Sequence, residues 1–401
     1  MERNLVLGVD AGSAHVAVTV AEMAEGEPQV IGVALLPSAG IHRGIIVDME
    51  AVGEAVGQAV EKACQMAGTP GLTRAVVSVS GAHILSVAGG SAVPVHRPSA
   101  GVGPEDVRRA LDGAAAAELP EGREVIHIAP RAYRLDGNGP VRDPVGMAGR
   151  TLEAEVQLIT GEALPIRNHL RAVREIGLDV VDYQVAVRAA GEAVLTAEEK
   201  EEGVLLLDLG SGTTGVAVYE RGHLFHLAVL PVGGEHITHD LAALLRLPVG
   251  TAEQVKRERG WADPALAPDA TFELVSPSGR KVREISDKKV AEIIGSRVEE
   301  ILQMAAASVK RSGYAGLFPA GLVLTGGASR LSGLVEVAAD SLALPARIGT
   351  ARGPLVGEPE LATAAGLVRW GAHLVRETAA QEIVGQDRFG RIRDWLKALF
   401  H

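Results

Sequence analysis

Stretches with the pattern of buried strands alternate along this chain with stretches that have the pattern of helices. Nearly continuous apolar runs at residues 5–9, 75–79 and 204–207 predict strands that are covered on both faces. Residues 286–311 instead repeat apolar side chains at helical spacing, which predicts a long helix with one core-facing stripe. The alternation predicts a mixed α/β protein. Further strands are expected at 124–135, 152–159 and 322–325, and further helices at 51–67, 104–118, 164–176 and within 237–259.

Two of the predicted strands run into the same short motif. Residues 5–9 lead into Asp10-Ala11-Gly12-Ser13, and residues 204–207 lead into Asp208-Leu209-Gly210-Ser211-Gly212-Thr213. Glycines and small hydroxyl residues let backbone N–H groups approach an anion closely, so each motif has the character of a phosphate-binding turn. Either motif alone is more often an ordinary Asp/Gly turn at the end of a strand. Two copies in the same context favour a nucleotide triphosphate held between duplicated halves.

The aspartates of the two motifs are candidates for holding a divalent cation. Mg²⁺ keeps most of its waters in proteins and is held through one or two carboxylates together with phosphate oxygens. Asp10 and Asp208 suit this role, with water between each carboxylate and the ion. Residues 322–328 lead a third predicted strand into Thr325-Gly326-Gly327-Ala328. This stretch predicts either a third backbone approach to the ligand or a plain strand–helix turn.

The composition is that of a folded protein of two or three domains. The chain has 401 residues, 47% of them hydrophobic, yet no stretch reaches the roughly 18 uninterrupted apolar residues of a spanning helix. The N-terminus lacks a secretory pattern, so we expect a cytoplasmic location. A net charge of −11 argues against nucleic-acid binding. The single cysteine, Cys64, excludes an intramolecular disulfide and is expected to be a buried, inert thiol.

Residues 387–401 differ in character from the rest of the chain, and residues 377–386 separate them from it as a predicted linker. On a helix, their large apolar side chains fall within one arc and their charged side chains cover the other. This pattern is typical of a helix that lies in an anionic membrane surface. A terminal helix that docks on its own domain is the alternative. The residues assigned to the membrane are Phe389, Ile392, Arg393, Trp395, Leu396, Lys397, Leu399 and Phe400.

The three glycine motifs, in this order, resemble the phosphate and adenosine motifs of the actin-like ATPase superfamily. Within it, the chain resembles the FtsA family of bacterial cell-division proteins. Three stretches carry this narrower similarity: residues 40–48 (GIHRGIIVD), 142–147 (RDPVGM), and 233–240 (GGEHITHD) followed by 252–256 (AEQVK). The resemblance implies an actin-like, duplicated ribonuclease H-like α/β fold. It further implies a nucleotide cleft between two halves, an inserted subdomain and a C-terminal amphipathic helix.

The resemblance also implies how the chain divides into subdomains. Residues 83–163 would form an inserted subdomain that serves self-assembly and contacts with other division proteins. Residues 244–319 would form a subdomain that receives the C-terminal peptide of the tubulin-like protein FtsZ. The first actin-like half would comprise 1–82 and 164–191 and the second 192–243 and 320–376, followed by the linker 377–386 and the membrane helix 387–401.

Carried over residue by residue, the resemblance implies a nucleotide site shared by both halves. Asp10, Asp208 and Gln184 take the catalytic positions, Gln184 by orienting a water toward the terminal phosphate; a buried hydrogen-bonding glutamine is the alternative. Arg297 matches a basic position on the helix that receives the FtsZ peptide, the alternative being a solvated charge. Glu253 and Lys256 match a pair near the ribose and adenine, or form a surface ion pair. The other nucleotide-binding positions are Gly12, Ser13, Ala14, His15, Gly210, Ser211, Gly212, Thr213, Gly234, Gly326, Gly327 and Ala328.

One position departs from the family's pattern. Family members often carry lysine where this chain has His15, and a neutral imidazole offsets phosphate charge less than an ammonium group does. We therefore expect binding of ATP and Mg²⁺ with at most weak ATPase activity.

The resemblance implies a cell-division protein that polymerises and tethers the FtsZ ring to the cytoplasmic face of the membrane at the division site. Its expected partners are the FtsZ peptide, further copies of itself, other division proteins and an anionic membrane surface. A pilus-assembly adaptor of the same superfamily and a small-metabolite kinase with the same fold remain alternatives.

Overall fold

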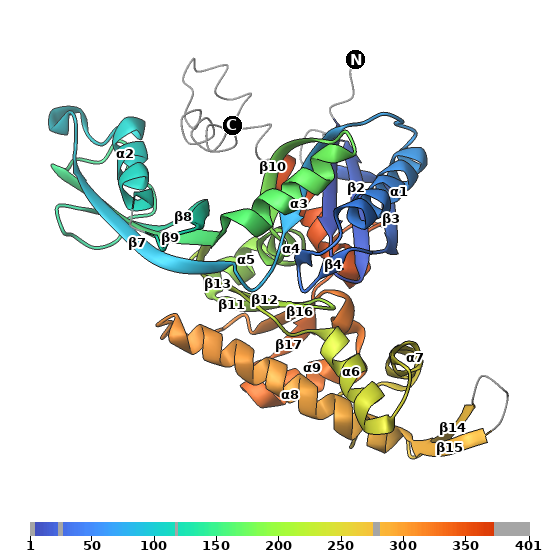
Figure 1. The fold of residues 1–401 in the computed structure, drawn as a ribbon. Helices are drawn as coiled ribbons and strands as arrows, with labels where there is room; N and C mark the ends of the chain where they lie inside the picture. Colours follow the sequence, from blue (N-terminus) through green and yellow to red (C-terminus); the bar gives the residue numbers. More distant parts are fainter. Residues whose placement is uncertain (1–4, 23–26, 117–118, 276–280, 373–401) are drawn as a thin grey trace.

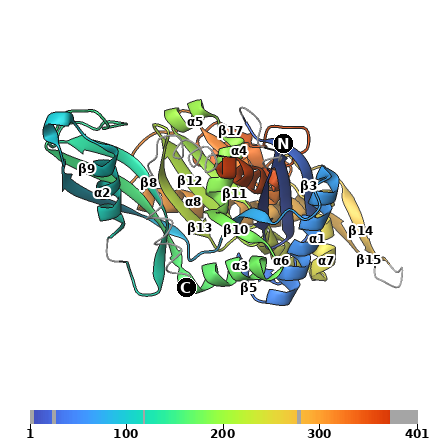
Figure 2. The same ribbon diagram turned by 90° about the horizontal axis from the view of Figure 1, so that it is seen from above.

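The computed structural model describes residues 5–22, 27–116, 119–275 and 281–372. They form two halves, one above the other in Figure 1, with a third unit that extends to the left of the first half and is seen from above in Figure 2. The predicted linker 377–386 and membrane helix 387–401 lie outside the described residues. No described helix is both long and apolar enough to span a membrane.

A five-stranded sheet forms the centre of the first half. Its strand order is β10-β6-β1-β2-β3, in which β1 pairs antiparallel with β2 and parallel with β6. Helix α1 (Met49–Ala67) packs against β2 and β3, begins after its N-cap Asp48 and ends at Gly68. The strands are β1 (Leu5–Ala11), β2 (His15–Glu22), β3 (Gln29–Pro37), β6 (Arg74–Val79) and β10 (Asp179–Val185).

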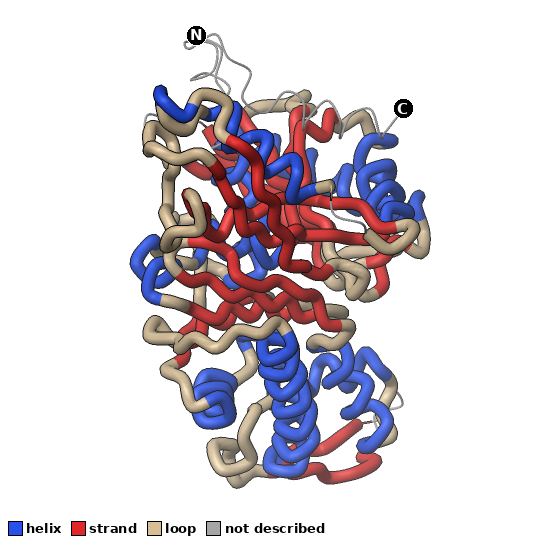
Figure 3. The backbone as a smooth tube through the Cα atoms, turned by 90° about the vertical axis from the view of Figure 1, so that its left-hand side faces the viewer, coloured by secondary structure: helices blue, strands red, loops and turns tan. Residues whose placement is uncertain are grey.

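The second half repeats this arrangement. Strand β11 pairs antiparallel with β12 and parallel with β16, as β1 does with β2 and β6. The repeated motifs of the sequence therefore belong to duplicated units, as predicted. In Figure 3, long helices of this half lie below the strands. The strands are β11 (Val204–Leu209), β12 (Thr214–Glu220), β13 (His223–Leu230), β16 (Leu322–Thr325) and β17 (Ala346–Ile348), and the helices are α6 (Gly234–Leu245), α7 (Val249–Arg259), α8 (Asp287–Arg311) and α9 (Leu334–Leu342).

The third unit is inserted in the first half but joined to the second. Its strands continue the second half's sheet in the order β13-β7-β9-β8, through a single register pair between Leu85 and Ala228. Beside this pair, the Leu227 N–H donates to Ser86 Oγ at 2.7 Å, and the Arg131 guanidinium lies 3.8 Å from the centre of the Phe225 ring. The inserted elements are β7 (Leu85–Pro94), α2 (Pro104–Ala115), β8 (Arg123–Leu135) and β9 (Thr151–Glu162).

Most predicted elements lie within a few residues of their observed bounds. The long helix α8 begins after Ser286, whose hydroxyl caps it by accepting the Lys289 N–H at 3.2 Å. Its predicted core stripe is confirmed, since Val290 and Ile294 are fully buried. Cys64 is buried, as expected. The remaining elements are β4 (Ile41–His42), β5 (Ile45–Ile46), α3 (Ala163–Glu175), α4 (Ala186–Val194), α5 (Ala197–Glu202), β14 (Thr271–Val275), β15 (Lys281–Ser286) and the 3₁₀ helices η1 (Pro98–Ala100), η2 (Gly327–Arg330) and η3 (Pro359–Leu361).

Candidate functional site

The two Asp-x-Gly-Ser motifs form the same turn in both halves. In the first turn, the Gly12 N–H donates to the His15 carbonyl oxygen at 3.0 Å. In the second turn, the Gly210 N–H donates to the Thr213 carbonyl oxygen, also at 3.0 Å. A Cβ on either glycine would lie 3.0 Å from the oxygen of the carbonyl that its N–H bonds, a close contact that favours glycine at both positions. Each turn thus presents backbone close to whatever lies in front of it.

The turns of the two halves face each other. The hydroxyl oxygens of Ser80 and Thr213 lie 3.5 Å apart where the two halves meet. A Cβ on Gly212 would lie 2.9 Å from Ser13 Oγ and 2.8 Å from Arg43 Cα. Residues 40–44, part of the first family-like stretch, lie at this meeting point, and the Gly44 N–H donates to Ser13 Oγ at 3.1 Å. The sequence pattern marked this stretch without indicating that it reaches the second turn.

The two aspartates are partly buried and close enough to influence each other. The Ser78 hydroxyl donates to Asp10 Oδ1 at 2.5 Å, but burial outweighs this bond and raises the pKa of Asp10 to about 6. Burial, together with repulsion from Asp10, raises the pKa of Asp208 to about 7. The surroundings of both carboxyl groups thus disfavour their ionised forms. A divalent cation bound between them would favour the ionised forms, so the pair suits such a cation.

Gln184 lies in line with Asp10 across the first sheet. It is the register partner of Ser78 in the parallel pair of β10 and β6, and Ser78 in turn contacts Asp10. The side chain is fully buried, and its Oε1 accepts the Val185 N–H at 2.9 Å. Its Nε2 has no hydrogen-bond partner among the described residues. The water-orienting role of Gln184 stays a prediction, and Nε2 is the atom available for it.

The residues predicted to lie near the adenosine come together at the start of α6. The Gly234 N–H donates to the Gly210 carbonyl oxygen at 2.9 Å, which ties α6 to the second turn. A Cβ on Gly234 would lie 3.2 Å from the Ala328 Cβ. Gly326 has φ +82°, and a Cβ there would lie 2.5 Å from Asp208 Oδ1. The third glycine motif therefore lies directly beside Asp208, and its next residue, Gly327, lies beside the Glu360 side chain.

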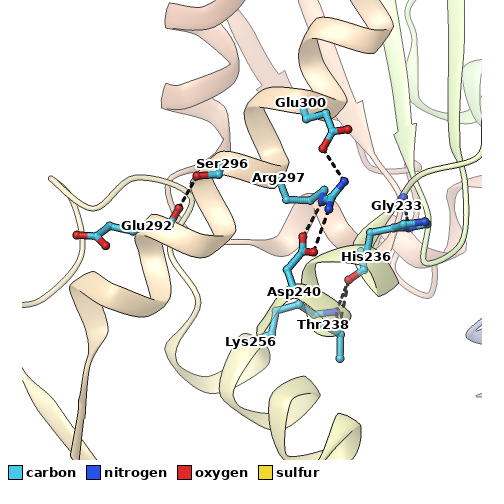
Figure 4. Close-up of polar contacts among 10 residues, drawn as sticks. Gly233, His236, Thr238, Asp240, Lys256, Glu292, Ser296, Arg297 and Glu300 are labelled. Carbon is cyan, nitrogen blue, oxygen red and sulfur yellow. Dashed lines mark hydrogen bonds and ion pairs between the residues drawn. The ribbon is translucent and has the colours of Figure 1, made fainter. Parts of the chain in front are cut away.

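Glu253 and Lys256 form an ion pair on α7 that also contacts α6. Lys256 Nζ lies 2.6 Å from Glu253 Oε2 and donates to the Gly234 carbonyl oxygen at 3.0 Å (Figure 4 shows Lys256). The Thr238 hydroxyl donates to the same Glu253 oxygen at 2.5 Å. Although burial opposes it, bonding to Lys256, Thr238 and Arg257 lowers the pKa of Glu253 to about 2. The ion pair is partly buried and is also bonded to α6, and its position beside the ribose and adenine stays a prediction.

His15 lies at the start of β2 in a partly buried position. Burial lowers its pKa, and the positive charge of Arg257 lowers it further, against the opposing effects of Glu360 and Glu253. His15 is therefore neutral near pH 7, as the sequence suggested. The charge of Arg257, on α7, near His15 was not predictable from the sequence, because it depends on how α7 packs in the folded chain.

Arg297 on α8 is bound to α6 rather than open to solvent (Figure 4). Its Nε donates to Asp240 Oδ2 at 2.6 Å and its Nη2 to Asp240 Oδ1 at 2.9 Å. Its Nη1 donates to Glu300 Oε2 at 2.5 Å. Arg297 is thus ion-paired to two carboxylates, and its role toward the FtsZ peptide stays a prediction. Asp240 ends the stretch 233–240 that carries the family resemblance, but nothing in that stretch shows its partner.

Comparisons with known proteins agree with this architecture. The family model "Cell division protein FtsA" matches residues 205–366, and the model "SHS2 domain inserted in FTSA" matches residues 81–160. Cell division protein FtsA of Pseudomonas aeruginosa is 34% identical over 95% of this chain and 92% of its own length. The chain belongs to the FtsA family. Its role is thereby that of an actin-like cell-division protein rather than that of either alternative, a pilus-assembly adaptor or a small-metabolite kinase.

Solved structures confirm the fold predicted for this FtsA-family chain. The PilM–PilN type IV pilus biogenesis complex has a chain that matches with a TM-score of 0.64 at 19% identity, covering 92% of this chain and 98% of the other. MreB5 of Spiroplasma citri bound to AMPPNP matches with a TM-score of 0.54 at 14% identity, covering 95% and 99%. At these identities the likeness concerns the actin-like fold. The inserted subdomain is the SHS2 domain of the family, while the other subdomain bounds remain predictions.

Proposed function

We propose that this chain is a nucleotide-controlled adaptor that polymerises and holds the FtsZ ring on the cytoplasmic face of the membrane at the division site. The observation that carries the proposal is the pair of identical turns that face each other across the cleft, each preceded by an aspartate of raised pKa. Such a site suits a ligand that is both anionic and accompanied by a cation. ATP with Mg²⁺ has both properties.

The residues around the cleft fit this ligand. Backbone at Gly12–Ala14 and at Gly210–Thr213 would approach the phosphates, and Asp10 and Asp208 would hold the hydrated cation. Gly326, Gly327, Glu253 and Lys256 would lie along the adenosine. The bound AMPPNP of the actin-like MreB5 structure supports a nucleotide on this fold. A neutral His15 offsets the charge of the terminal phosphates less than the lysine of other family members would. We therefore infer that ATP is hydrolysed slowly.

The partner surfaces follow from the subdomain division. Residues 244–319 would receive the acidic C-terminal peptide of FtsZ, with Arg297 as the cation that meets it. Residues 83–163 would serve contacts between copies and with other division proteins. The junction of this unit with the second half, through Leu85 and Ala228, supports a link between the nucleotide cleft and those contacts.

Residues 387–401 would act as the membrane anchor. Burying six large apolar side chains contributes at most roughly 9–18 kcal/mol. Ordering the segment opposes this with about 1 kcal/mol or more per residue. Each basic residue adds about 1 kcal/mol toward anionic lipid. A single anchor would therefore bind reversibly, and a polymer with many anchors would stay on the membrane through effective concentration.

Co-sedimentation of the full chain with anionic liposomes, with and without ATP, tests the proposal. We expect Trp395→Glu to abolish co-sedimentation because it places a charge in the apolar arc, while Trp395→Phe retains it. We expect ATP to increase co-sedimentation of the wild-type chain, since assembled copies bind together. Binding that is unchanged by Trp395→Glu would refute the anchor.

A further inference from the structure

Helix α6 is fixed at its first turn to the nucleotide site. The Gly234 N–H donates to the Gly210 carbonyl oxygen at 2.9 Å, and the Glu235 N–H donates to the Ser211 carbonyl oxygen at 2.8 Å. Both acceptors belong to the second turn of the cleft. A Cβ on Gly233 would lie 2.5 Å from the Ser211 carbonyl oxygen, so the approach leaves no space between helix and turn. Any displacement of the second turn therefore displaces α6.

The first half also reaches α6. Nδ1 of His42, in the stretch 40–48, lies 3.7 Å from Oε1 of Glu235. His42 comes from the same loop as Gly44, which donates to Ser13 in the first turn. A movement of one half against the other would thus change the position of His42 relative to α6. One helix is in contact with both sides of the cleft.

The next turn of α6 contacts α7 and α8 on opposite sides. Thr238 faces α7, where its hydroxyl receives a hydrogen bond from Lys256 Nζ at 2.8 Å. Asp240, two residues later, lies about 200° around the helix. It faces α8 and accepts two hydrogen bonds from Arg297, at 2.6 and 2.9 Å (Figure 4). One turn of α6 therefore joins Lys256, which is predicted to lie near the adenosine, to Arg297, which is predicted to meet the peptide.

Arg297 is not available to a third carboxylate as it stands. The carboxylates of Asp240 and Glu300 both form ion pairs with the Arg297 guanidinium. An acidic peptide that approaches this site meets a surplus of negative charge and must displace one of them. The Asp240 pair depends on the position of α6, whereas Glu300 lies three residues from Arg297 on the same helix and moves with it.

We propose that Asp240 is a latch through which the nucleotide site controls access to Arg297. Two parallel N–H···O bonds of this kind require both distances at once, so a small movement of α6 weakens both. Release of Asp240 frees the guanidinium for an acidic peptide, and return of α6 covers it again. The inference rests on the proposed function, in which Arg297 receives the FtsZ peptide.

Fluorescence anisotropy with a labelled synthetic FtsZ C-terminal peptide, on the full chain with and without Mg²⁺ and AMPPNP, tests the latch. We expect the wild-type affinity to differ between the two conditions. Asp240→Asn keeps the size of the side chain but removes its charge, so it should bind the peptide about tenfold more tightly. It should also give the same affinity with and without nucleotide.

Glu300→Gln is the matched control, because it removes a charge from the same guanidinium but from α8 itself. It should bind the peptide more tightly and keep the response to nucleotide. Arg297→Ala should abolish binding in both conditions. If Arg297→Ala binds like wild type, the proposed peptide site is wrong. If Arg297→Ala abolishes binding but Asp240→Asn keeps the nucleotide response, or wild type shows none, the peptide site stands and the latch is overturned.

Discussion

Asp10 and Asp208 occupy the same place in two copies of one turn, and the charge of Asp10 helps to raise the pKa of Asp208. Each lies two residues before a glycine whose N–H closes the turn at 3.0 Å. The duplication therefore brings together two acids that the chain separates widely. The proximity of the two carboxylates disfavours their ionised forms, and a divalent cation between the halves would favour those forms.

The first prediction concerns that cation. Asp10→Asn and Asp208→Asn should each weaken the binding of a fluorescent ATP analogue in the presence of Mg²⁺ by about 10–100-fold, the usual effect of losing a group that holds a metal's ligands. Titrations with Mg²⁺ and with EDTA measure the effect. Asp340→Asn, the same change at an exposed position on α9, should have no effect. A full response to Mg²⁺ in both cleft variants would contradict the assignment.

The second prediction concerns pH. The raised pKa values of Asp10 and Asp208, about 6 and about 7, mean that between pH about 4 and 7 the folded chain holds protons that the unfolded chain has released. The free energy of unfolding should therefore fall as pH rises through this range, for Asp10 by about 3 kcal/mol.

Comparison with Asp208→Asn isolates the contribution of Asp208, because Asp10 and the histidines with lowered pKa, which act in the opposite direction, titrate in both proteins. Urea unfolding at about pH 5.5 and about pH 8 without Mg²⁺ should show a larger loss of stability in the wild type than in the variant. Adding Mg²⁺ should reduce the wild-type loss. Equal losses in the two proteins would show that Asp208 does not titrate in this range.

The third prediction concerns Gly326. Gly326→Ala should be destabilising because φ is +82° and the new Cβ would lie 2.5 Å from Asp208 Oδ1. Gly313→Ala is the control, since Gly313 has φ +75° but no atom within 4 Å of such a Cβ. Both substitutions place alanine at a positive φ, so this cost to the free energy of unfolding is common to them. The clash should lower the free energy of unfolding of Gly326→Ala by about 1–3 kcal/mol more. Urea unfolding measures the difference, and nucleotide binding should be lost in Gly326→Ala alone.

The fourth prediction concerns His15. His15→Lys should bind the ATP analogue about tenfold more tightly, because an ammonium group adds a full charge beside the phosphates where the imidazole is neutral. His96→Lys makes the same change at an exposed position of the inserted unit and should leave the affinity as it is. An unchanged affinity in His15→Lys would mean that this side chain does not face the phosphates.

The parts of the fold that follow from local pattern were predictable. The strand and turn of each motif, and the start of α8 at its N-cap Ser286, depend on neighbouring residues alone. The junction of β7 with β13 was not predictable. It depends on one register pair, Leu85 with Ala228, between segments far apart in the chain, and it leaves no periodic signal in either.

The candidate site shows the same division. The glycine motifs were found because close backbone approach restricts the residue type at each position. Arg297 was found by resemblance, yet its bond to Asp240 could not be, because a salt bridge between two helices follows from their packing. The effect of the Arg257 charge on His15 was not predictable either, because it too depends on how the helices pack.

The central claim is that one chain joins a nucleotide, an FtsZ tail and a membrane. Recruitment of a labelled FtsZ C-terminal peptide to anionic liposomes by the full chain, with and without ATP and Mg²⁺, tests it most directly. We expect the peptide to sediment with the liposomes, to a degree that depends on ATP, and to stay in solution with Trp395→Glu or Arg297→Ala. Recruitment that is absent in the wild type, or unaffected by both substitutions, would contradict the account.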